Sequence, residues 1–248
     1  MNPFRTLFNS VADFCWPRIC PVETCHRPSD RPERHLCSHC LATLPFFESG
    51  GMCRICGGLV AAATQHEFIC EDCTKNPPAY EISRSAVRFL EPARSLVLDF
   101  KFHKATWLKD DLVDLLEGLV HAKMDFAAID VLVPVPLHPN RLRQRGYNQS
   151  ALLAEGLAQR LNRRFDAHSL VRVRDTEHQS RLDRKLRLTN LDHAFKVVRP
   201  QFIRGRTVLL VDDVSTTGTT LSTCAQALLD AGSARVWCAT VARSTQEG

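Results

Sequence analysis

At residues 207–221 the chain reads TVLLVDDVSTTGTTL, and this stretch decides its fold. It opens with an apolar run, residues 208–211, that is too short for a helix and rich in β-branched side chains. Such a run predicts a strand buried on both faces, as in parallel sheets. Asp212 and Asp213 follow, where we expect the strand to end, and a helix is expected over residues 221–231. The order strand, turn, helix indicates an α/β protein.

The expected turn consists of small, mostly hydroxylated residues. A turn between a strand and a helix points free backbone N–H groups and the positive end of the helix dipole at one spot, which suits phosphate. Glycine lets the backbone come close, and the hydroxyls add donors. The alternative is a turn whose hydroxyls only cap the helix, but caps account for one or two hydroxyls and not for paired acids. The predicted phosphate-binding residues are Ser215, Thr216, Thr217, Gly218, Thr219 and Thr220.

This run resembles the signature of the type I phosphoribosyltransferases, which bind 5-phosphoribosyl 1-diphosphate (PRPP). The resemblance implies an open, mainly parallel sheet flanked by helices. It also implies that the acidic pair, Asp212 and Asp213, holds the ribose hydroxyls, and that the Thr-Gly loop, residues 215–220, holds the 5′-phosphate. Mg²⁺ would accompany the bound PRPP.

The charge of the chain is distributed unevenly. It has 248 residues, 44% hydrophobic and 24% charged, which allows one or two globular domains. Residues 1–80 carry 7 basic and 8 acidic side chains, whereas residues 81–248 carry 25 and 19. The basic excess therefore lies in the half with the expected phosphate site, where an anionic ligand or nucleic acid would benefit from it. We expect a cytoplasmic protein, because we find neither an apolar stretch long enough to span a membrane nor a signal peptide.

Eleven cysteines are many for such a protein, and nine of them lie between residues 15 and 73. Eight form four pairs, three of them CxxC pairs and the first with four intervening residues. Two such pairs can complete a tetrahedral zinc site of four thiolates. We expect neighbouring pairs to share an ion, giving two structural zinc ions. The predicted ligands are Cys20, Cys25, Cys37 and Cys40 in the first site, and Cys53, Cys56, Cys70 and Cys73 in the second.

Disulfides and a redox CxxC are the alternatives for these cysteines. The missing secretory signal and the CxxC spacing oppose disulfides, and no thioredoxin-like strand–helix unit surrounds the pairs. The segment buries little apolar surface and would need metal to fold. We therefore predict two domains. Residues 1–78 form an N-terminal helix, expected over residues 4–14, and a zinc-binding module, and residues 79–248 form the phosphoribosyltransferase-like domain.

The middle of the chain carries a second set of signals. Strands are expected over residues 85–90 and 131–135, and helices over residues 108–120 and 148–163. Between the second strand and the second helix, residues 137–149 read LHPNRLRQRGYNQ. We expect a basic loop here, at the strand end where open α/β sheets bind ligands, and its arginines can hold pyrophosphate. Alternatively, these arginines are solvated surface.

The last third of the chain contains a polar stretch between two apolar ones. Residues 172–190 have many charges and no clear period, which predicts a long mobile loop with a frayed helix. Strands are expected over residues 194–198 and 235–241.

Four features stand in one order: the cysteine pairs, PVPLHPNRLRQRGYNQS, RDTEHQSRLDRKLRLTNLDHAF and VLLVDDVSTTGTT. This order resembles the ComF family, competence-associated proteins in which a zinc module is joined to a phosphoribosyltransferase domain, and it covers nearly the whole chain. The motif residues in the basic loop are Pro136, His138, Arg141, Arg145, Gly146, Asn148 and Gln149. Those in the mobile loop are Arg174, Thr176, Gln179, Leu182, Arg187 and Asn190.

The chain departs from the family pattern at two places. Its first cysteine pair has four intervening residues instead of two. The usual Lys-Tyr-Arg-Gly after the first strand is Lys101-Phe102-His103-Lys104, which keeps the lysine and loses the glycine.

The family resemblance implies a PRPP-binding protein that acts in natural transformation, on incoming single-stranded DNA and with DNA-uptake proteins. The alternative is an active phosphoribosyltransferase of nucleotide metabolism that releases pyrophosphate from PRPP. A third reading, a zinc interaction module with a degenerate domain, is opposed by the intact acidic pair. No residue indicates a catalytic base or an acceptor site. The residues expected to hold pyrophosphate or to lie in the mobile loop are Lys101, His138, Arg141, Arg145, Arg174 and Arg187.

Overall fold

The computed structural model describes residues 17–47, 51–59, 68–174 and 194–244. The helix expected over residues 4–14 and most of the expected mobile loop lie outside these ranges.

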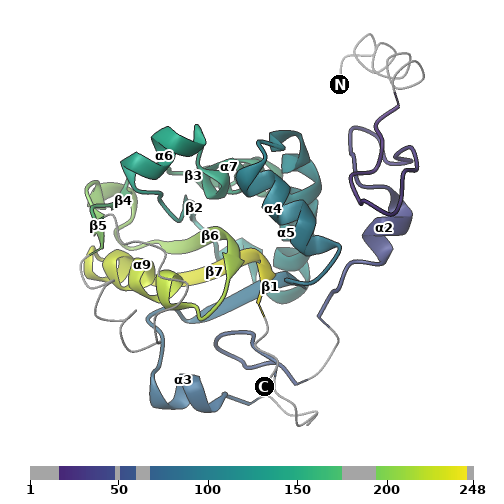
Figure 1. Ribbon diagram of the computed structural model, residues 1–248. Coiled ribbons are helices and arrows are strands. Elements are labelled where there is room, and N and C mark those ends of the chain that lie inside the picture. Colours follow the sequence, from purple (N-terminus) through teal and green to yellow (C-terminus); the bar gives the residue numbers. More distant parts are fainter. Residues whose placement is uncertain (1–16, 48–50, 60–67, 175–193, 245–248) are drawn as a thin grey trace.

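Five parallel strands form the main sheet, in the order β1-β7-β6-β2-β3 (Figure 1). A small antiparallel sheet pairs β4 with β5. The predicted open, mainly parallel sheet is therefore confirmed, although the strand expected over residues 194–198 belongs to the small sheet. The strands are β1 Ile82–Arg88, β2 Val131–Pro134, β3 Arg164–Phe165, β4 Leu170–Arg172, β5 Phe195–Val197, β6 Thr207–Ser215 and β7 Arg235–Arg243.

Strand β6 is the centre of the main sheet, because it pairs with β2 on one side and β7 on the other. Its apolar residues are fully buried and alternate between the two faces. Leu209 and Val211 join one hydrophobic cluster, and Val208 and Leu210 join the other. The predicted strand is thus confirmed, but the predicted range was too short. Strand β6 continues to Ser215, so both carboxylates lie within the strand instead of after it.

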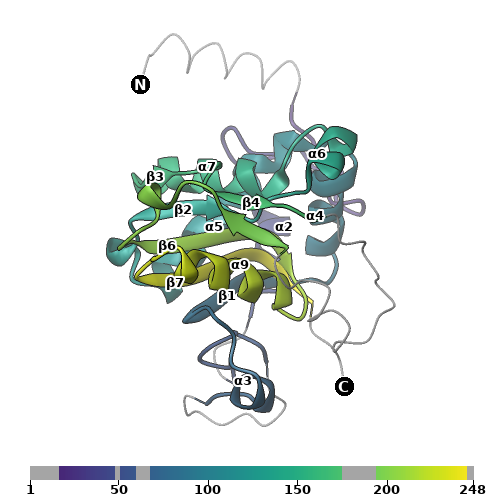
Figure 2. The same ribbon diagram turned by 90° about the vertical axis from the view of Figure 1, so that its left-hand side faces the viewer.

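Helices cover both faces of the sheet (Figure 2). Buried leucines and valines of α4, α5 and α7 form one cluster with the sheet, and α9 packs with the small sheet on the opposite face. The predicted helices over residues 108–120, 148–163 and 221–231 correspond to three of these. The helices are α2 Ser38–Ala42, α3 Glu71–Lys75, α4 Ala93–Phe102, α5 Lys109–Lys123, α6 Pro139–Arg145, α7 Gln149–Leu161 and α9 Thr219–Asp230, with 3₁₀ turns at Thr106–Leu108, Phe126–Ala128 and Pro200–Phe202.

The expected basic loop is instead the short helix α6 followed by a sharp turn. His138 caps this helix, its Nδ1 accepting a hydrogen bond from the N–H of Asn140 at 3.3 Å. Pro139 occupies the first helical position, where its missing N–H costs nothing. Gly146 ends the helix in the left-handed region, with φ of 88°. These local signals form a helix in a sequence whose arginines indicated a loop.

The two cysteine segments dock on opposite faces of the main sheet. Cys20, Cys37 and Cys40 belong to the cluster under α4, α5 and α7, whereas Cys53 and Cys73 belong to the cluster under α9. Figure 1 shows the corresponding helices, α2 and α3, at well-separated places on the molecule.

Charged residues and backbone hydrogen bonds hold both segments in place. Arg31 and Arg34 of the first segment contact Asp114 on α5, at 2.5 Å and 2.6 Å. In the second segment, the carbonyl of Ile55 accepts a hydrogen bond from the N–H of Ser83 at 2.7 Å. Each segment therefore rests on the α/β core through contacts far apart in sequence.

Across the described residues, no helix has both the length and the apolar character needed to cross a membrane.

Candidate functional site

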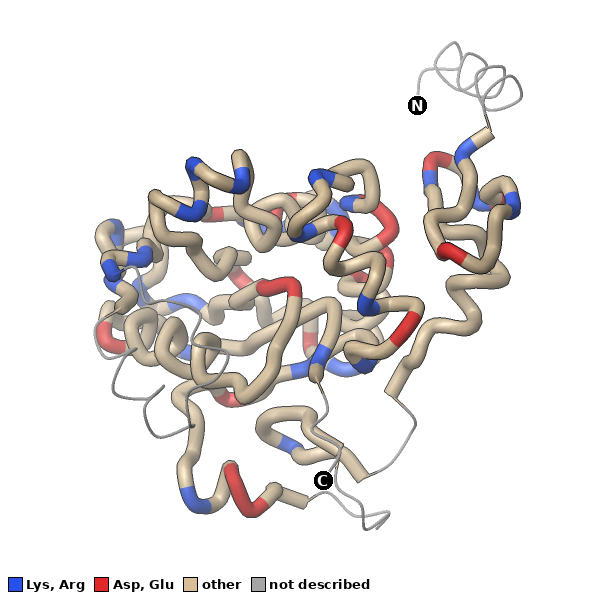
Figure 3. The backbone as a smooth tube through the Cα atoms, viewed as in Figure 1, with Lys and Arg blue, Asp and Glu red and all other residues tan. Residues whose placement is uncertain are grey.

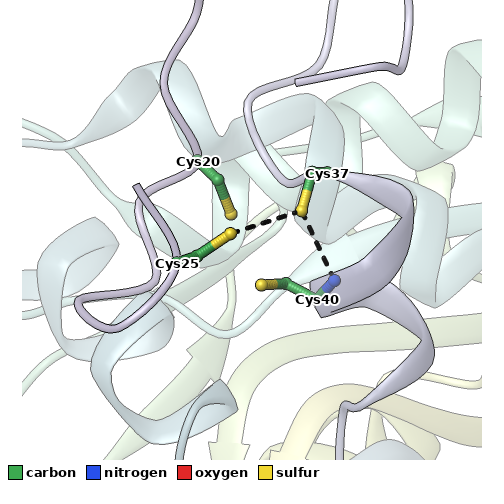
Figure 4. Close-up of side chains that lie close together, drawn as sticks. All are labelled: Cys20, Cys25, Cys37 and Cys40. Carbon is green, nitrogen blue, oxygen red and sulfur yellow. Dashed lines mark hydrogen bonds between the residues drawn. The ribbon is translucent and has the colours of Figure 1, made fainter. Parts of the chain in front are cut away.

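The first four cysteines converge on one point (Figure 4). Their Sγ atoms lie within 4.8 Å of one another, and Cys25 and Cys37 approach to 3.6 Å. The wide first pair is accommodated by a turn, in which the N–H of Cys25 donates to the carbonyl of Val22 at 2.8 Å. The expectation that Cys20, Cys25, Cys37 and Cys40 come together is confirmed, and the departure in spacing does not prevent it.

The second set of four cysteines, Cys53, Cys56, Cys70 and Cys73, meets the same distance limit. Cys56 and Cys70 lie 3.8 Å apart, and the N–H of Cys70 donates to the sulfur of Cys53 at 3.3 Å. Backbone donors of this kind favour the thiolate form, which is the form that binds metal.

Two clusters of four cysteine sulfurs each can hold a structural metal ion such as zinc. All described cysteines are free, so none is engaged in a disulfide. The N–H of Arg27 lowers the pKa of Cys25 to about 7. Cys224 and Cys238 lie apart from both sites, fully buried against the sheet, and burial raises the pKa of each thiol. We refer to the clusters as the first and second four-cysteine sites.

The acidic pair is buried at the end of β6. Asp212 is 9% exposed and Asp213 only 2%. The hydroxyl of Ser150, at the start of α7, donates to Asp212 Oδ1 at 2.7 Å. Lys101 Nζ, at the end of α4, lies 2.8 Å from Asp213 Oδ2. Two helices that are distant in sequence thus supply a hydroxyl and an ammonium to the carboxylates.

Burial changes the protonation of this pair. It is the main cause that raises the pKa of Asp212 to about 7, and the negative charge of Asp213 adds to it. The charge of Lys101 and the hydrogen bond from Ser150 oppose this rise. The pKa of one carboxyl of the pair therefore lies near neutral pH, and a bound cation would favour the ionised form of this carboxyl.

The Thr-Gly loop joins the acidic pair to α9. Gly218 caps the helix in the left-handed region, with φ of 75°. The N–H of Thr219, the first residue of α9, donates to Thr217 Oγ1 at 3.4 Å. The hydroxyls of Thr217 and Thr219 lie 2.8 Å apart. Within the described ranges, no acceptor is found for the N–H groups of Thr220 and Leu221. Free N–H groups at a helix start beside hydroxyls form an arrangement that binds phosphate.

Two basic side chains, Lys101 of α4 and Arg145 of α6, lie near the acidic pair. Figure 3 shows Lys and Arg along α6. Arg145 donates to Gln149 at 2.5 Å, and its guanidinium lies 5.0 Å from the ring centre of Phe102. Since Lys101 precedes Phe102, the structure brings Lys101 and Arg145 to the same region. Arg141 lies on the same short helix, and His138 caps its start.

The residue that replaces the family glycine keeps the glycine-like conformation. Lys104 has φ of 58°, which is unusual for a residue with a side chain. The turn after α4 thus has a glycine-like conformation at a position that holds lysine.

The remaining predicted residues are not joined to the site by the described structure. Arg174 follows β4, which belongs to the small antiparallel sheet. Arg187 lies outside the described residues, as do Thr176, Gln179, Leu182 and Asn190.

Sequence reasoning missed two residues of this region. Ser150 is the last residue of the quoted motif PVPLHPNRLRQRGYNQS, so its position could have been marked. Tyr80 is different, because no motif points to it: it is 4% exposed, and its hydroxyl lies beside Gly218.

Comparison with known proteins agrees with this geometry. The family model described as "Phosphoribosyl transferase domain" matches residues 148–247. The chain is 31% identical over 234 residues to "DNA utilization protein YhgH" of Escherichia coli strain K12, covering 92% of this chain and 97% of that protein. It is 34% identical over 191 residues to "Competence protein F" of Haemophilus influenzae, covering 75% and 81%. It is 30% identical over 216 residues to "Competence protein ComFC" of Bacillus subtilis, covering 82% of each chain.

Fold and site thus define a protein with a phosphoribosyltransferase-type domain and two four-cysteine sites. The extent of the similarity shows that the chain belongs to the ComF family. The resemblance drawn from the order of its motifs is confirmed.

Proposed function

We propose that this protein binds PRPP together with Mg²⁺ at the carboxyl end of β6, and that it acts on incoming single-stranded DNA during DNA uptake. One observation carries the first part of the proposal. The acidic pair lies on β6 directly before the Thr-Gly loop, so a carboxylate site and a phosphate site adjoin at one end of the central strand.

Each part of PRPP has a counterpart in this arrangement. The Thr-Gly loop offers N–H groups and hydroxyls to the 5′-phosphate. Asp212 and Asp213 would hold the ribose hydroxyls and Mg²⁺, since carboxylates suit both. Lys101 and the arginines of α6 would take the pyrophosphate, together with Arg174 and Arg187 of the expected mobile loop.

The experiment compares ligand binding by the parent chain and by Asp212→Asn/Asp213→Asn. PRPP with Mg²⁺ should raise the melting temperature of the parent by mass action and should release heat in calorimetry. The double variant should lose most of both signals. As a matched control, Asp110→Asn/Asp230→Asn removes two carboxylates that lie on α5 and α9, and this variant should respond to PRPP like the parent. If the acidic-pair variant binds PRPP as well as the parent does, the ribose site lies elsewhere.

The DNA part of the proposal is supported by the relatives and by charge. The E. coli relative is named a DNA utilization protein, and those of H. influenzae and B. subtilis are named competence proteins. The basic excess lies in the half of the chain that carries α6. The alternative, an active phosphoribosyltransferase in nucleotide metabolism, is distinguished by turnover, because only an enzyme releases pyrophosphate when PRPP and an acceptor are supplied.

The remaining parts of the proposal concern the domain boundary and the cellular location of the protein. We propose that residues 1–78 form the zinc-binding module and residues 79–248 the phosphoribosyltransferase-like domain, in a cytoplasmic protein that meets DNA-uptake partners there. Limited proteolysis of the zinc-loaded protein, with mass analysis of the stable fragments, tests the boundary.

A further inference from the structure

A cavity of about 360 Å³ lies between the second four-cysteine site and the start of α9. One wall comes from the second cysteine segment and the other from the Thr-Gly loop and the first turn of α9. The cavity thus connects a predicted phosphate loop with a metal site on the same face of the sheet. The residues that matter for its chemistry are Asp72, Lys75, Tyr80, Thr217, Gly218 and Arg243.

Tyr80 is the unusual residue of this cavity. It is almost completely buried, since only 4% of its surface is exposed. No hydrogen bond joins its hydroxyl to any residue of the described chain, although a buried phenol normally finds a partner. The hydroxyl lies 2.9 Å from the position that a β-carbon on Gly218 would take. Only glycine therefore fits beside it, and the hydroxyl sits over the backbone of the Thr-Gly loop.

The cavity lining contains both positive and negative groups. Lys75 and Arg243 are its two cations, and the carboxylate of Asp72 and the sulfurs of Cys56 and Cys73 also line it. Lys75 pairs with Glu71 at 2.5 Å. Arg243 is held in place because its Nη1 donates to the carbonyl of Cys56 at 2.8 Å. In the sheet Arg243 is the register partner of Ser215, whose buried hydroxyl has no hydrogen-bond partner in the described chain.

The Tyr80 hydroxyl is available as a hydrogen-bond donor, because a phenol is neutral at physiological pH. A neutral phenol donates its proton to an acceptor, and a phosphate oxygen is a strong acceptor.

We propose that this cavity binds the phosphate group of a sugar 5-phosphate, and that Tyr80 is a further ligand-binding residue which donates to the phosphate held by the Thr-Gly loop. The inference rests on the proposed PRPP function and deepens it. It gives the second four-cysteine site a part in the ligand pocket, because that site fixes the segment from Asp72 to Tyr80 against α9. Ala79 on this segment anchors it, its N–H donating to Ser222 Oγ at 3.0 Å.

The test is Tyr80→Phe, which removes the hydroxyl and keeps the buried ring. Titration calorimetry with ribose 5-phosphate, and with PRPP and Mg²⁺, should show binding weakened by about 10- to 150-fold, the loss expected for one hydrogen bond to a charged group. Binding of inorganic pyrophosphate should be unchanged, since it lacks the sugar phosphate. Lys75→Met, which changes an exposed residue on the opposite wall, should weaken ribose 5-phosphate in the same direction.

Ser233→Ala is the matched control. Ser233 also has a buried hydroxyl without a partner in the described chain, but it lies beyond the other end of α9. This variant should bind ribose 5-phosphate like the parent.

The outcomes separate this inference from the proposed function. If the parent binds PRPP, and Tyr80→Phe and Lys75→Met bind ribose 5-phosphate as tightly as the parent, the role of Tyr80 is overturned and the PRPP proposal stands. If the parent binds neither compound, both fail. A trinucleotide with and without a 5′-phosphate distinguishes the source of the phosphate: phosphate-dependent binding that Tyr80→Phe weakens would place a DNA strand end in the same cavity.

Discussion

The ammonium of Lys101 and the carboxylate of Asp213 lie 2.8 Å apart at the carboxyl end of the sheet. The side chain of Lys101 is 18% exposed and that of Asp213 only 3%. This ion pair ties the end of α4 to the end of β6. It also means that a bound Mg²⁺ or ribose would have to share Asp213 with Lys101, so a residue expected to hold pyrophosphate also holds the acidic pair.

The two carboxylates should therefore differ in their effect on stability. Asp213→Asn removes the buried carboxylate that pairs with the partly buried Lys101 and should lower the free energy of unfolding by roughly 1–3 kcal/mol. Asp212→Asn removes a buried charge that is repelled by Asp213, while the amide oxygen can still accept from Ser150. It should raise the melting temperature at pH 8 by about 3 °C. Thermal unfolding of the two single variants, without ligand, checks both directions, and equal destabilisation by both would contradict this account.

The effect of Asp212 on stability should depend on pH. Its pKa in the folded state is raised to about 7, above the value of 3.8 in the unfolded chain, so the folded protein holds this proton more tightly. The resulting stabilisation is complete below pH of about 4 and is lost as pH rises through 7. The advantage of Asp212→Asn over the parent should thus be smaller at pH 5.5, in the middle of this range, than at pH 8, where it is full. Because groups away from the acidic pair titrate alike in both proteins, the difference between their melting temperatures reports on this pair.

The docking of the first cysteine segment on α5 should depend on the carboxylate of Asp114. Besides Arg31 and Arg34, this carboxylate contacts Arg160 at 3.2 Å. Burial would raise the pKa of Asp114, but the hydrogen bond from Arg34 and the neighbouring positive charges hold it below its ordinary value. Asp114→Ala should therefore cost about 3 kcal/mol, because three arginines lose their shared acceptor.

Asp110→Ala on the same helix is the control for this prediction. Asp110 is 54% exposed and lies 3.9 Å from Arg160, so its loss should cost less than about 1 kcal/mol. Urea unfolding of both variants measures the contrast. A loss at Asp114 no greater than at Asp110 would show that apolar packing alone docks the segment.

The number of zinc ions bound per chain should equal the number of intact four-cysteine sites. Purified protein should contain two zinc ions per chain, one for each cluster. Cys37→Ser and Cys53→Ser should each lower the content to about one ion, because a site with three thiolates binds zinc more weakly. Cys224→Ala, at a buried cysteine outside both sites, should keep two. Elemental analysis measures the zinc content of each variant. An unchanged zinc content in Cys37→Ser would show that the first four-cysteine site does not bind zinc.

The sequence predicted the parts of this molecule that depend on local pattern. The apolar run before Asp212 indicated a buried strand because a central parallel strand is apolar on both faces. The CxxC spacing indicated the ligand sets because ligands close in sequence must converge on one ion.

Other features depend on contacts between residues that are distant in sequence. Burial of the acidic pair requires Lys101 and Ser150, which come from two other helices. The docking of the cysteine segments on opposite faces depends on pairs such as Arg31 and Asp114, 83 positions apart. Spacing carries no information about such pairs. The helix α6, in contrast, could have been predicted from local sequence, because His138 and Gly146 are typical of a helix start and a helix end. The arginines between them indicated a basic loop instead.

The last prediction concerns single-stranded DNA and the arginines of α6. If incoming DNA meets this face, Arg141→Ala/Arg143→Ala should weaken binding of a labelled oligonucleotide and reduce its salt dependence, because phosphate contacts release counterions. Saturating PRPP should compete, since both ligands would use the basic residues near the acidic pair. The alternative is that these arginines serve only pyrophosphate and solvent.

Arg164→Ala/Arg204→Ala provides the matched control for charge. Both residues are exposed and lie next to the amino ends of β3 and β6, at the opposite edge of the sheet. Fluorescence anisotropy at low and moderate salt should show a larger loss for the α6 variant than for this control. Equal losses would mean that only net charge attracts DNA. Binding that PRPP leaves unchanged would direct the search to the four-cysteine sites, because the ligand pocket would then be separate from the DNA surface.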